Sequence, residues 1–278
     1  MADRPVNVAS VPHRSPFRYP GGKTWLVPRI RRWLDRVGPV AHLIEPFAGG
    51  AIVGLSALFD GLAGRITLVE KDPRVAAVWR ALVDGHAEEL AERIARFEVS
   101  EAAVRAALDA TPATITDRAF ATILRNRMQR GGILAPGASL MRAGENGRGL
   151  RSRWYPETLR RRLLDIGARS RQITFIEGDG PEVIQKHAHE ADAVFFVDPP
   201  YTVAGRRLYA HNELDHAGLF RRMTAVRGDF LMTYDNVEAV RRLAEEHGLD
   251  TLPIAMKSTH HAVMTELLIG RNLAWARE

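Results

Sequence analysis

The tetrapeptide Asp198-Pro199-Pro200-Tyr201 follows directly on the apolar run Ala193–Val197. If this run is a buried strand, the tetrapeptide lies at its C-terminal end, which is where open α/β sheets bind their ligands. Each proline fixes φ at about −65° and removes a backbone donor, so the turn presents a carboxylate, carbonyl oxygens and an aromatic face. A flat ligand rich in N–H groups fits these features, as the exocyclic amine of a nucleobase does.

A second group of candidate residues follows two earlier apolar runs. The turn from Glu45 to Ala51 is rich in small residues, which let a ligand approach the backbone and the N-terminus of the helix expected from about Ile52. Glu70 ends the next apolar run, about 20 residues after this turn. In dinucleotide-binding folds an acid at this distance from the glycine-rich turn binds the hydroxyl pair of a ribose. The alternative for Glu70 is a solvated acid at a strand end.

The segment Phe17–Thr24 contains two glycines followed by Lys23 and has some likeness to a phosphate-binding loop. That motif requires glycine where Phe17 stands, and no strand precedes the segment, so we reject it. A lysine at the start of a helix beside two glycines still indicates a charged or carboxylate ligand.

Seven β-like runs must position these residues, and helical patterns of ten to sixteen residues lie between most of them. This alternation predicts a mostly parallel sheet covered on both faces. The last two runs are too close for a crossover helix and predict an antiparallel hairpin. The predicted strands are 42–45, 66–70, 173–177, 193–197, 230–234, 252–256 and 266–269. The predicted helices between them include 23–37, 74–83, 181–188, 215–226 and 237–247.

The strand rhythm stops between Val83 and Ile173. Residues 86–97, 100–110 and 116–129 have helical patterns, with caps expected at Ser100 and Thr116, and a glycine-rich stretch runs from Gly131 to Gly149. Strands resume afterwards, so we expect an insert in one α/β core and not a tandem domain. The predicted organisation is a disordered tail at 1–15, a core at 16–85 and 155–278, and a target-recognition insert at 86–154.

Composition and charge limit the class of protein. The chain has no cysteine, which excludes disulfides, thiolate metal sites and cysteine nucleophiles, and no apolar stretch reaches the roughly 20 residues of a membrane span. The first 15 residues lack the apolar core of a secretory signal, so we expect a cytoplasmic protein. The net charge is +6, and residues 118–171 hold 13 arginines, no lysine and 3 acids. This basic block predicts a polyanion partner, although an arginine-rich genome would also favour arginine over lysine.

Taken in order, the motifs resemble the Dam-type (D12 class) N6-adenine DNA methyltransferases. The resemblance is carried by Tyr19-Pro-Gly-Gly-Lys23, Glu45-Pro-Phe-Ala-Gly49, Glu70, Gly178-Asp179 and Asp198-Pro-Pro-Tyr201, and it extends to the run Glu266–Ile269. It implies a seven-stranded, mostly parallel, Rossmann-like sheet of the S-adenosylmethionine-dependent methyltransferases, with an inserted, mainly helical target-recognition domain.

The resemblance implies a role for each matching residue. Glu45 matches an acid near the methionine amine of S-adenosylmethionine, Glu70 matches the ribose-binding acid, and Asp179 matches an acid near the adenine amine, with a helix N-cap as its alternative. The family commonly has glycine where Ala51 stands; because alanine favours φ below zero, we expect a differently shaped turn there. The cofactor-binding residues implied are Tyr19, Lys23, Glu45, Phe47, Gly49, Glu70, Asp179 and Asp198.

The catalytic residues implied are Asp198, Pro199, Pro200 and Tyr201. The Asp198 carboxylate and the Pro199 carbonyl would accept the two N–H bonds of the adenine amine and aim its lone pair at the methyl group, while Tyr201 stacks on the base. In a duplex this requires the base to flip out of the helix. Nothing in this mechanism needs a metal, and His260 and His261 lack the further ligands of a zinc site.

The expected activity is therefore S-adenosylmethionine-dependent methylation of adenine N6 in a specific double-stranded DNA sequence, with a cognate restriction endonuclease as a possible partner. The alternatives are an RNA amine methyltransferase and a catalytically idle DNA-binding protein with this fold. A loop at 202–212 is expected to close over DNA. The candidate DNA-binding residues are Arg125, Arg127, Arg130, Arg142, Arg148, Arg151, Arg153, Arg206 and Arg207.

Overall fold

The structure is a computed structural model. It describes residues 10–18, 22–129, 134, 139–141, 147, 149–201, 214–257 and 263–277. No helix in these described ranges is both long enough and apolar enough to cross a membrane.

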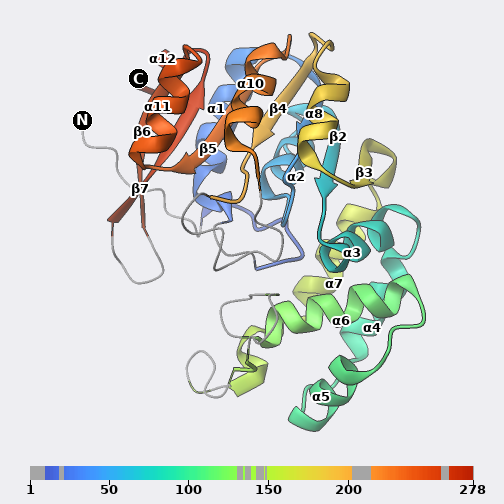
Figure 1. Ribbon diagram of the computed structural model, residues 1–278. Helices are drawn as coiled ribbons and strands as arrows, with labels where there is room; N and C mark the ends of the chain where they lie inside the picture. The colour runs from blue at the N-terminus through green and yellow to red at the C-terminus, as the bar shows by residue number, and fades with distance from the viewer. Residues whose placement is uncertain are drawn as a thin grey trace.

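A single seven-stranded sheet forms the centre of the protein, with the strand order β3-β2-β1-β4-β5-β7-β6 (Figure 1). The first five strands in this order are parallel, and β7 pairs antiparallel with both β5 and β6. This confirms the predicted fold class, the seven strands and the terminal hairpin. The strands are β1 Val40–Glu45, β2 Ala63–Glu70, β3 Ile173–Glu177, β4 Ala193–Val197, β5 Phe230–Asp235, β6 Asp250–Lys257 and β7 Val263–Gly270.

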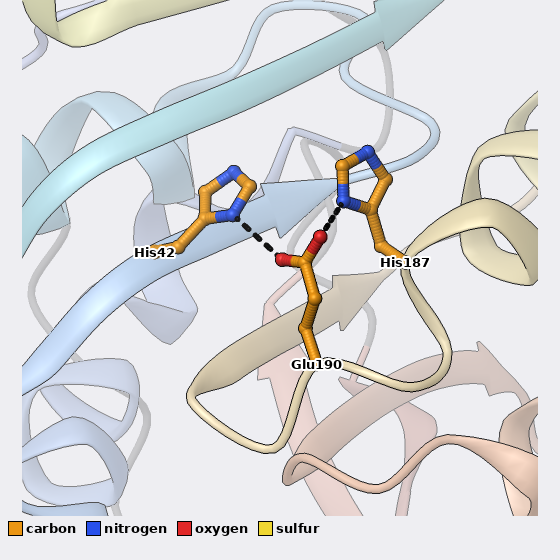
Figure 2. A group of neighbouring side chains, drawn as sticks. All are labelled: His42, His187 and Glu190. Carbon is orange, nitrogen blue, oxygen red and sulfur yellow. Dashed lines mark hydrogen bonds and ion pairs between the residues drawn. The ribbon is translucent and has the colours of Figure 1, made fainter.

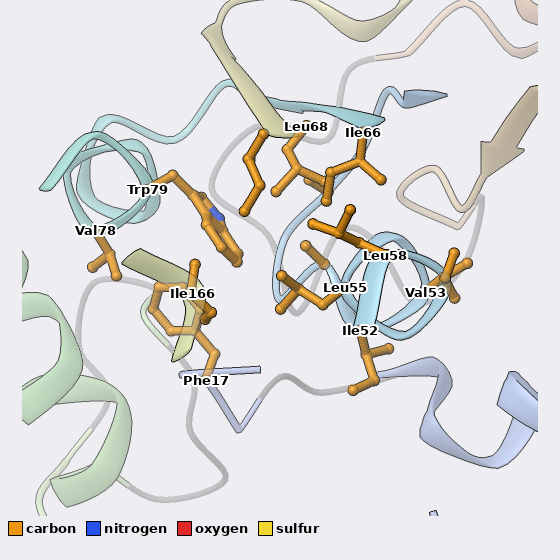
Figure 3. Close-up of a cluster of buried hydrophobic side chains, with 14 of the residues drawn as sticks. Phe17, Ile52, Val53, Leu55, Leu58, Ile66, Leu68, Val78, Trp79 and Ile166 are labelled. Carbon is orange, nitrogen blue, oxygen red and sulfur yellow. The ribbon is translucent and has the colours of Figure 1, made fainter. Parts of the chain in front are cut away.

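The two faces of the sheet hold two separate apolar cores, because successive side chains of a strand point to opposite faces. Leu43 and Phe196 belong to the larger core, which also includes α1, α2 and α3, whereas Ile44 and Phe195 belong to the smaller core against α8, α10 and α11. Every residue of β4 is buried, as expected for a central parallel strand covered on both faces. Figure 3 shows the larger core, where Phe17 and Trp79 approach from outside the sheet.

The helices follow the strands in the predicted rhythm. The core helices are η2 Lys23–Leu26, α1 Val27–Val37, α2 Ile52–Phe59, α3 Pro73–Val83, η6 Ser170–Gln172, α8 Gly180–His187, α10 His216–Ala225, α11 Glu238–Glu246 and α12 Ala274–Arg277. The remaining helices are α4 Ala87–Arg96, α5 Glu101–Asp109, α6 Ile115–Met128, η5 Gly149–Arg153 and α7 Pro156–Gly167. Helices α3 to α7 lie together beyond one end of the sheet (Figure 1).

Local hydrogen bonding fixes where the insert helices begin. The Ala103 N–H donates to Ser100 Oγ at 3.1 Å, so the predicted cap of α5 is confirmed. The predicted cap at Thr116 is wrong, because α6 begins earlier, at a capping box formed by Thr114 and Asp117. Thr116 lies two residues after this cap, within the first turn of α6; it is buried and donates to Glu89 Oε2 at 2.9 Å, which ties α6 to α4.

Residues 10–18 are packed against the rest of the protein, and so residues 10–15 do not belong to a disordered tail as predicted. Val11 and Ser15 are buried, and the Arg14 guanidinium lies 4.7 Å from the centre of the Phe59 ring. The side-chain amide of Asn126 on α6 makes two hydrogen bonds with the backbone of Arg18. Its oxygen accepts from the Arg18 N–H at 2.9 Å, and its nitrogen donates to the Arg18 carbonyl at 3.0 Å. These contacts come from residues distant in sequence, so no local pattern announces them.

Candidate active site

Asp198 stands at the C-terminal end of β4, and both oxygens of its carboxylate already have partners. Thr233 Oγ1, on the neighbouring strand β5, donates to Asp198 Oδ1 at 2.7 Å. Lys23 Nζ, at the start of η2, lies 3.0 Å from Asp198 Oδ2. Each carboxylate oxygen has a second lone pair, so the group can still accept hydrogen bonds from a ligand. Asp198 is half-buried, and the strand end therefore presents an oriented acceptor.

Tyr201 lies beside this carboxylate with its ring nearly parallel to that of Tyr234, at a centroid separation of 6.2 Å and an angle of 20°. Lys23 Nζ is 5.0 Å from the centre of the Tyr201 ring. Burial, with added repulsion from the Asp198 and Glu266 carboxylates, raises the pKa of Tyr201 well above its usual range. Tyr201 is therefore a neutral aromatic surface at neutral pH and not an acid or base.

Glu45 ends β1, next to β4, and its carboxyl group is buried. Glu45 Oε2 accepts a hydrogen bond from the Gly54 N–H, in the first turn of α2, at 2.8 Å. A side chain at Gly54 would collide with this oxygen, since an added Cβ would lie 2.7 Å from it. Burial raises the pKa of Glu45 to about 8; the Gly54 N–H opposes the rise and the charge of Asp198 adds to it.

The turn between β1 and α2 is held by backbone contacts. The Ala48 N–H donates to the Val69 carbonyl at 2.9 Å, and the indole N–H of Trp79 on α3 donates to the Gly49 carbonyl at 3.0 Å. Ala51, at the N-cap of α2, has φ 49° and ψ 34°, so our expectation that this alanine takes a φ below zero is wrong. The left-handed conformation costs alanine about 1–2 kcal/mol, which the contacts of Ala48 and Gly49 with Val69 and Trp79 help to offset.

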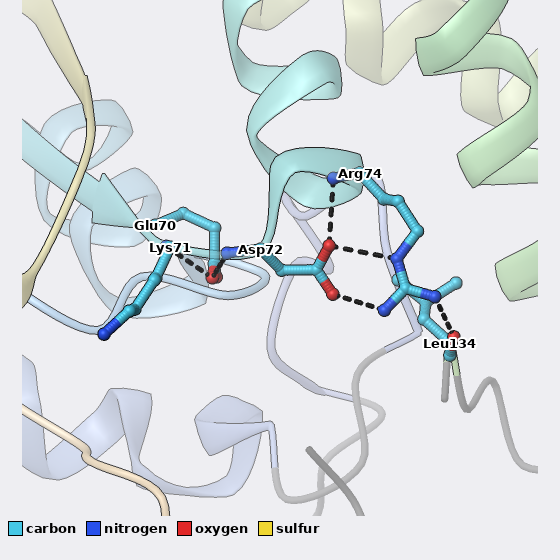
Figure 4. A network of polar contacts seen from close by, with 5 residues as sticks. All are labelled: Glu70, Lys71, Asp72, Arg74 and Leu134. Atoms are coloured by element: carbon cyan, nitrogen blue, oxygen red, sulfur yellow. Dashed lines mark hydrogen bonds and ion pairs between the residues drawn. The ribbon is translucent and has the colours of Figure 1, made fainter. Parts of the chain in front are cut away.

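Glu70, at the end of β2, organises the second turn (Figure 4). Glu70 Oε1 accepts from the backbone N–H groups of Lys71 and Asp72, both at 2.8 Å, and Oε2 accepts from the Gly49 N–H at 3.1 Å. Burial raises the pKa of Glu70 to about 7 against the opposing effect of these N–H donors. One carboxyl group therefore joins the two predicted cofactor turns.

Figure 4 also shows how this turn reaches the insert. Asp72 caps α3 by accepting from the Arg74 N–H at 2.9 Å, and its two oxygens accept from the Arg74 guanidinium. The same guanidinium donates to the carbonyl of Leu134. The acid turn after β2 is thus fastened through Asp72 and Arg74 to the glycine-rich part of the insert.

Asp179 occupies the N-cap position of α8, the alternative left open from the sequence, but its side chain makes no capping hydrogen bond. Instead Asp179 Oδ2 lies 3.4 Å from Lys71 Nζ, and both side chains are largely exposed. The neighbouring Gly180 packs tightly, because a Cβ there would lie 2.3 Å from the Pro46 carbonyl and 3.1 Å from the Phe47 ring. Asp179 and Phe47 therefore border the same turn as Glu45.

The structure adds two residues to which the sequence assigned no role, Thr233 and Glu266. Thr233 holds Asp198, and Glu266 Oε2 lies 3.5 Å from Lys23 Nζ. The sequence signal for Glu266 was an acid at the start of an apolar run. Because β7 runs antiparallel to β5, its early residues lie beside the C-terminal end of β5, with Glu266 opposite Asp235. Thr233 gave no signal, because threonine is common in strands.

The predicted arginines lie in different environments. Arg127 is buried on α6, and its guanidinium donates to the Pro16 carbonyl at 2.7 Å; burial and then neighbouring arginines lower its pKa to about 9. This placement argues against contact between Arg127 and DNA. Arg125 is half-buried, Arg151 is exposed and donates to the Val99 carbonyl at 3.2 Å, and Arg153 is half-buried. Tyr19, Arg130, Arg142, Arg148, Arg206 and Arg207, the loop at 202–212, and His260 and His261 lie outside the described residues.

A second polar cluster is formed by His42, His187 and Glu190 (Figure 2). It lies near the N-terminal ends of β1 and β4, away from the strand ends that carry Glu45 and Asp198. His187 Nδ1 is 2.7 Å from Glu190 Oε1, and His42 Nδ1 is 3.5 Å from Glu190 Oε2. His42 Nε2 is 2.7 Å from Thr67 Oγ1, and the Arg65 guanidinium is 3.3 Å from His42 Nδ1. Burial and then Arg65 lower the pKa of His42. A guanidinium already occupies the nitrogen through which a metal would bind, so we interpret the cluster as a connection between β1 and the α8–β4 link.

The cofactor edge of this sheet is also the part of the chain that carries a family signature. Residues 19–98 match the model of the D12 class N6 adenine-specific DNA methyltransferases. The match confirms the resemblance drawn from the motifs, and it covers Lys23, Glu45, Gly49 and Glu70. It ends within the insert and does not reach Asp198 or Tyr201.

Comparison with solved structures gives more distant similarities. One is a proposed RNA methyltransferase from Pyrococcus horikoshii, with 10% identity, TM-score 0.42 and coverage of 95% of this chain and 92% of that one. A second is a SAM-dependent methyltransferase from Agrobacterium tumefaciens, with 10% identity, TM-score 0.40 and coverage of 90% and 62%. A third is a precorrin-6y C5,15-methyltransferase from Geobacter metallireducens, with 10% identity, TM-score 0.38 and coverage of 87% and 86%. These scores are too low to bear on the substrate. No curated protein sequence matched the chain.

The family match identifies S-adenosylmethionine as the cofactor, and the residues at the sheet edge fit it. In the described part of the chain, neither the buried Glu45 nor the half-buried Glu70 forms an ion pair with lysine or arginine, and the pKa of each is raised. A ligand with an ammonium group, a sulfonium group and ribose hydroxyls supplies the positive charge that these acids lack, and further hydrogen-bond donors for their remaining lone pairs. Glu45, Glu70 and the turn at Gly49 are therefore the groups that would hold it.

Proposed function

We propose that this methyltransferase acts on the N6 amine of adenine in double-stranded DNA. The observation that supports this proposal most directly is the position of Asp198-Pro199-Pro200-Tyr201 at the end of β4, one strand away from the buried acid Glu45 on β1. An acceptor turn and an aromatic ring thus stand beside the acids that suit the cofactor. The D12 family name supports adenine in DNA as the substrate.

The chemistry asked of these residues is the alignment of a weak nucleophile. The adenine N6 lone pair is delocalised into the ring, so a hydrogen-bonded, pyramidal amine is the reactive form. Thr233 fixes the orientation of the Asp198 carboxylate, and this carboxylate and the Pro199 carbonyl can accept the two N6 hydrogens. When bound, S-adenosylmethionine supplies an electrophilic methyl group. N6 gains positive charge as the N–C bond forms, and the Asp198 carboxylate is placed to take the surplus proton.

Tyr201 provides the surface on which a flipped base would stack. Its ring is already held by Tyr234, and its raised pKa keeps it uncharged, so it can contact a purine without an ordering cost of its own. Flipping costs a few kcal/mol, to be offset by stacking and by phosphate contacts. Within the described residues, the candidates for those phosphate contacts are Arg125, Arg151 and Arg153. A partner restriction endonuclease and a cytoplasmic location stay predictions.

Incubation with tritiated S-adenosylmethionine and mixed-sequence duplex DNA tests the proposal. We expect label in N6-methyladenine, and its absence would reject the proposal. Ribosomal RNA offered in competition addresses the RNA alternative, because an RNA enzyme would transfer label to the RNA first. Asp198→Ala should abolish turnover while DNA affinity is retained. Equal turnover by this variant would remove Asp198 from the mechanism, and no turnover by the wild type on any nucleic acid would favour an idle DNA-binding protein.

A further inference from the structure

Lys23 is buried between two carboxylates that come from different strands. Its Nζ lies 3.0 Å from Asp198 Oδ2 on β4 and 3.5 Å from Glu266 Oε2 on β7, and its side chain is only 3% exposed. Glu266 is 8% exposed at the side chain, and its Oε2 makes no hydrogen bond of good geometry within the described structure. The three groups form an ionic triad in which Lys23 and Glu266 are buried. The sequence assigned roles to Asp198 and Lys23 but none to Glu266.

The sheet explains why Glu266 can reach this place. β7 runs antiparallel to β5, so its early residues lie at the edge where the parallel strands end, with Glu266 opposite Asp235. Side chains alternate between faces, and Glu266 shares the face of Leu268, which belongs to the core that includes Leu26 of η2. Lys23, at the start of η2, therefore meets Glu266 from above that face.

The charges of the triad matter because the reaction makes N6 positive. Burial lowers the pKa of Lys23, but the Asp198 carboxylate and then the Glu266 carboxylate raise it by more than burial lowers it. The pKa of Lys23 is therefore above its usual value, and the ammonium stays protonated at neutral pH. Alone with Asp198, this ammonium would neutralise the carboxylate that must face a developing cation. Burial raises the pKa of Glu266, and the ammonium of Lys23 opposes this rise. When Glu266 is ionised, the triad carries a net charge of −1.

We propose that Glu266 is a positioning residue, which holds Lys23 between the two strands and leaves Asp198 with the negative charge that the amine needs. This inference rests on the proposed methylation of adenine for its kinetic consequence, but the coupling between Glu266 and Lys23 does not. A purely structural ion pair would contribute to folding without affecting the rate at Asp198, so the two roles make different predictions.

Glu266→Gln in the full chain is the test, because glutamine keeps the shape and removes the charge. We expect kcat to fall on the order of tenfold, less than the 10²–10³-fold cost of removing a direct transition-state donor, with little change in the KM for DNA. Glu190→Gln, which removes a carboxylate at the opposite edge of the sheet, is the matched control and should leave kcat unchanged. A loss of thermal stability with kcat unchanged would make Glu266 structural only and would overturn the proposal.

Lys23→Met tests whether Glu266 acts through Lys23. In that background Glu266→Gln should lower kcat by less than twofold, because no ammonium remains to be balanced. Equal losses in both backgrounds would overturn the proposal.

A measurement independent of turnover covers the case in which Lys23→Met is inactive or adenine is not the substrate. The chain has only four lysines, Lys23, Lys71, Lys186 and Lys257, so the ε-carbon of each can be followed by NMR through a pH titration. We expect Glu266→Gln to lower the pKa of Lys23 and to leave Lys71 and Lys186 unchanged. An unchanged Lys23 titration would reject the coupling itself, whereas a lowered pKa without any adenine methylation would reject only the proposed function.

Discussion

Replacement of Glu45 by glutamine should stabilise the ligand-free protein and weaken its binding of the cofactor. Glu45 is 4% exposed, and its pKa is about 8 in the folded protein compared with 4.5 for an unperturbed glutamate. Each pH unit between the two values costs about 1.4 kcal/mol of unfolding free energy, because the unfolded chain ionises this group and the folded chain resists it. The cost is about 3 kcal/mol at pH 7 and about 5 kcal/mol above pH 8.

The pH dependence distinguishes this effect from a change in packing. A group whose folded pKa is raised contributes its full stability below the unfolded pKa of 4.5 and loses it as the pH rises through about 8. Urea unfolding at pH 5 should therefore show wild type and Glu45→Gln within about 1 kcal/mol of each other. At pH 7.5 the variant should be more stable by about 3–4 kcal/mol. Glu238→Gln, on the exposed face of α11, is the control and should change stability by no more than about 0.5 kcal/mol at either pH.

The cofactor should narrow this difference in stability between the wild type and the variant. At a concentration of about 100 times its Kd, S-adenosylmethionine stabilises the wild type by about 2.7 kcal/mol, whereas the variant, without the acid, should gain much less. A stability difference that is the same at pH 5 and pH 7.5, or a variant less stable than the wild type at pH 7.5, would refute the reasoning, because either result means that the Glu45 carboxyl group is not under an electrostatic penalty.

Three further predictions concern the same edge of the sheet. Ala51→Gly should raise the unfolding free energy by about 0.5–1 kcal/mol, since relief of the left-handed strain exceeds the entropy that glycine loses on folding; a destabilised variant in thermal unfolding would contradict it. Thr233→Val should lower kcat about tenfold through loss of the hydrogen bond to Asp198, and unchanged single-turnover rates would show that this bond does not orient the carboxylate. The affinity for S-adenosylmethionine, measured by calorimetry, should rise up to about tenfold per pH unit as the pH approaches 8, because the cation favours ionised Glu45; a flat profile, or the same slope in Glu45→Gln, would exclude this acid as its partner.

Patterns in the chain were sufficient to predict the sheet because each element was defined by neighbouring residues. The all-apolar run of β4 followed by Asp198 predicted a buried strand with chemistry at its end, and the structure has both. Helix beginnings were less certain, as α6 shows. Thr114 and Thr116 both stand three residues before a candidate partner. Thr114 is the cap, because Asp117 completes a capping box with it, whereas Thr116 packs against Glu89 on α4.

The candidate site was predicted as a set of residues but not as an arrangement. Glu45, Glu70 and Asp198 were each found at a strand end, and parallel strands bring such ends to one edge. The ionic bridge from Lys23 to Glu266 could not be predicted, because it depends on the antiparallel direction of β7 and on the position of η2 over it. Arg127 was a candidate DNA-binding residue because of its place in a basic block, yet it is buried and its guanidinium donates to the Pro16 carbonyl.

The order of motifs along this chain determined the fold, the cofactor class and the acceptor turn at Asp198, since local periodicity and turn chemistry are properties of adjacent residues. Only the tertiary structure decided which charges share an enclosure. The pKa values of Glu45 and Glu70 and the pairing of Lys23 with Asp198 and Glu266 depend on burial and on distances between groups far apart in sequence. Electrostatic energies vary steeply with both quantities, and neither is encoded in spacing along the chain.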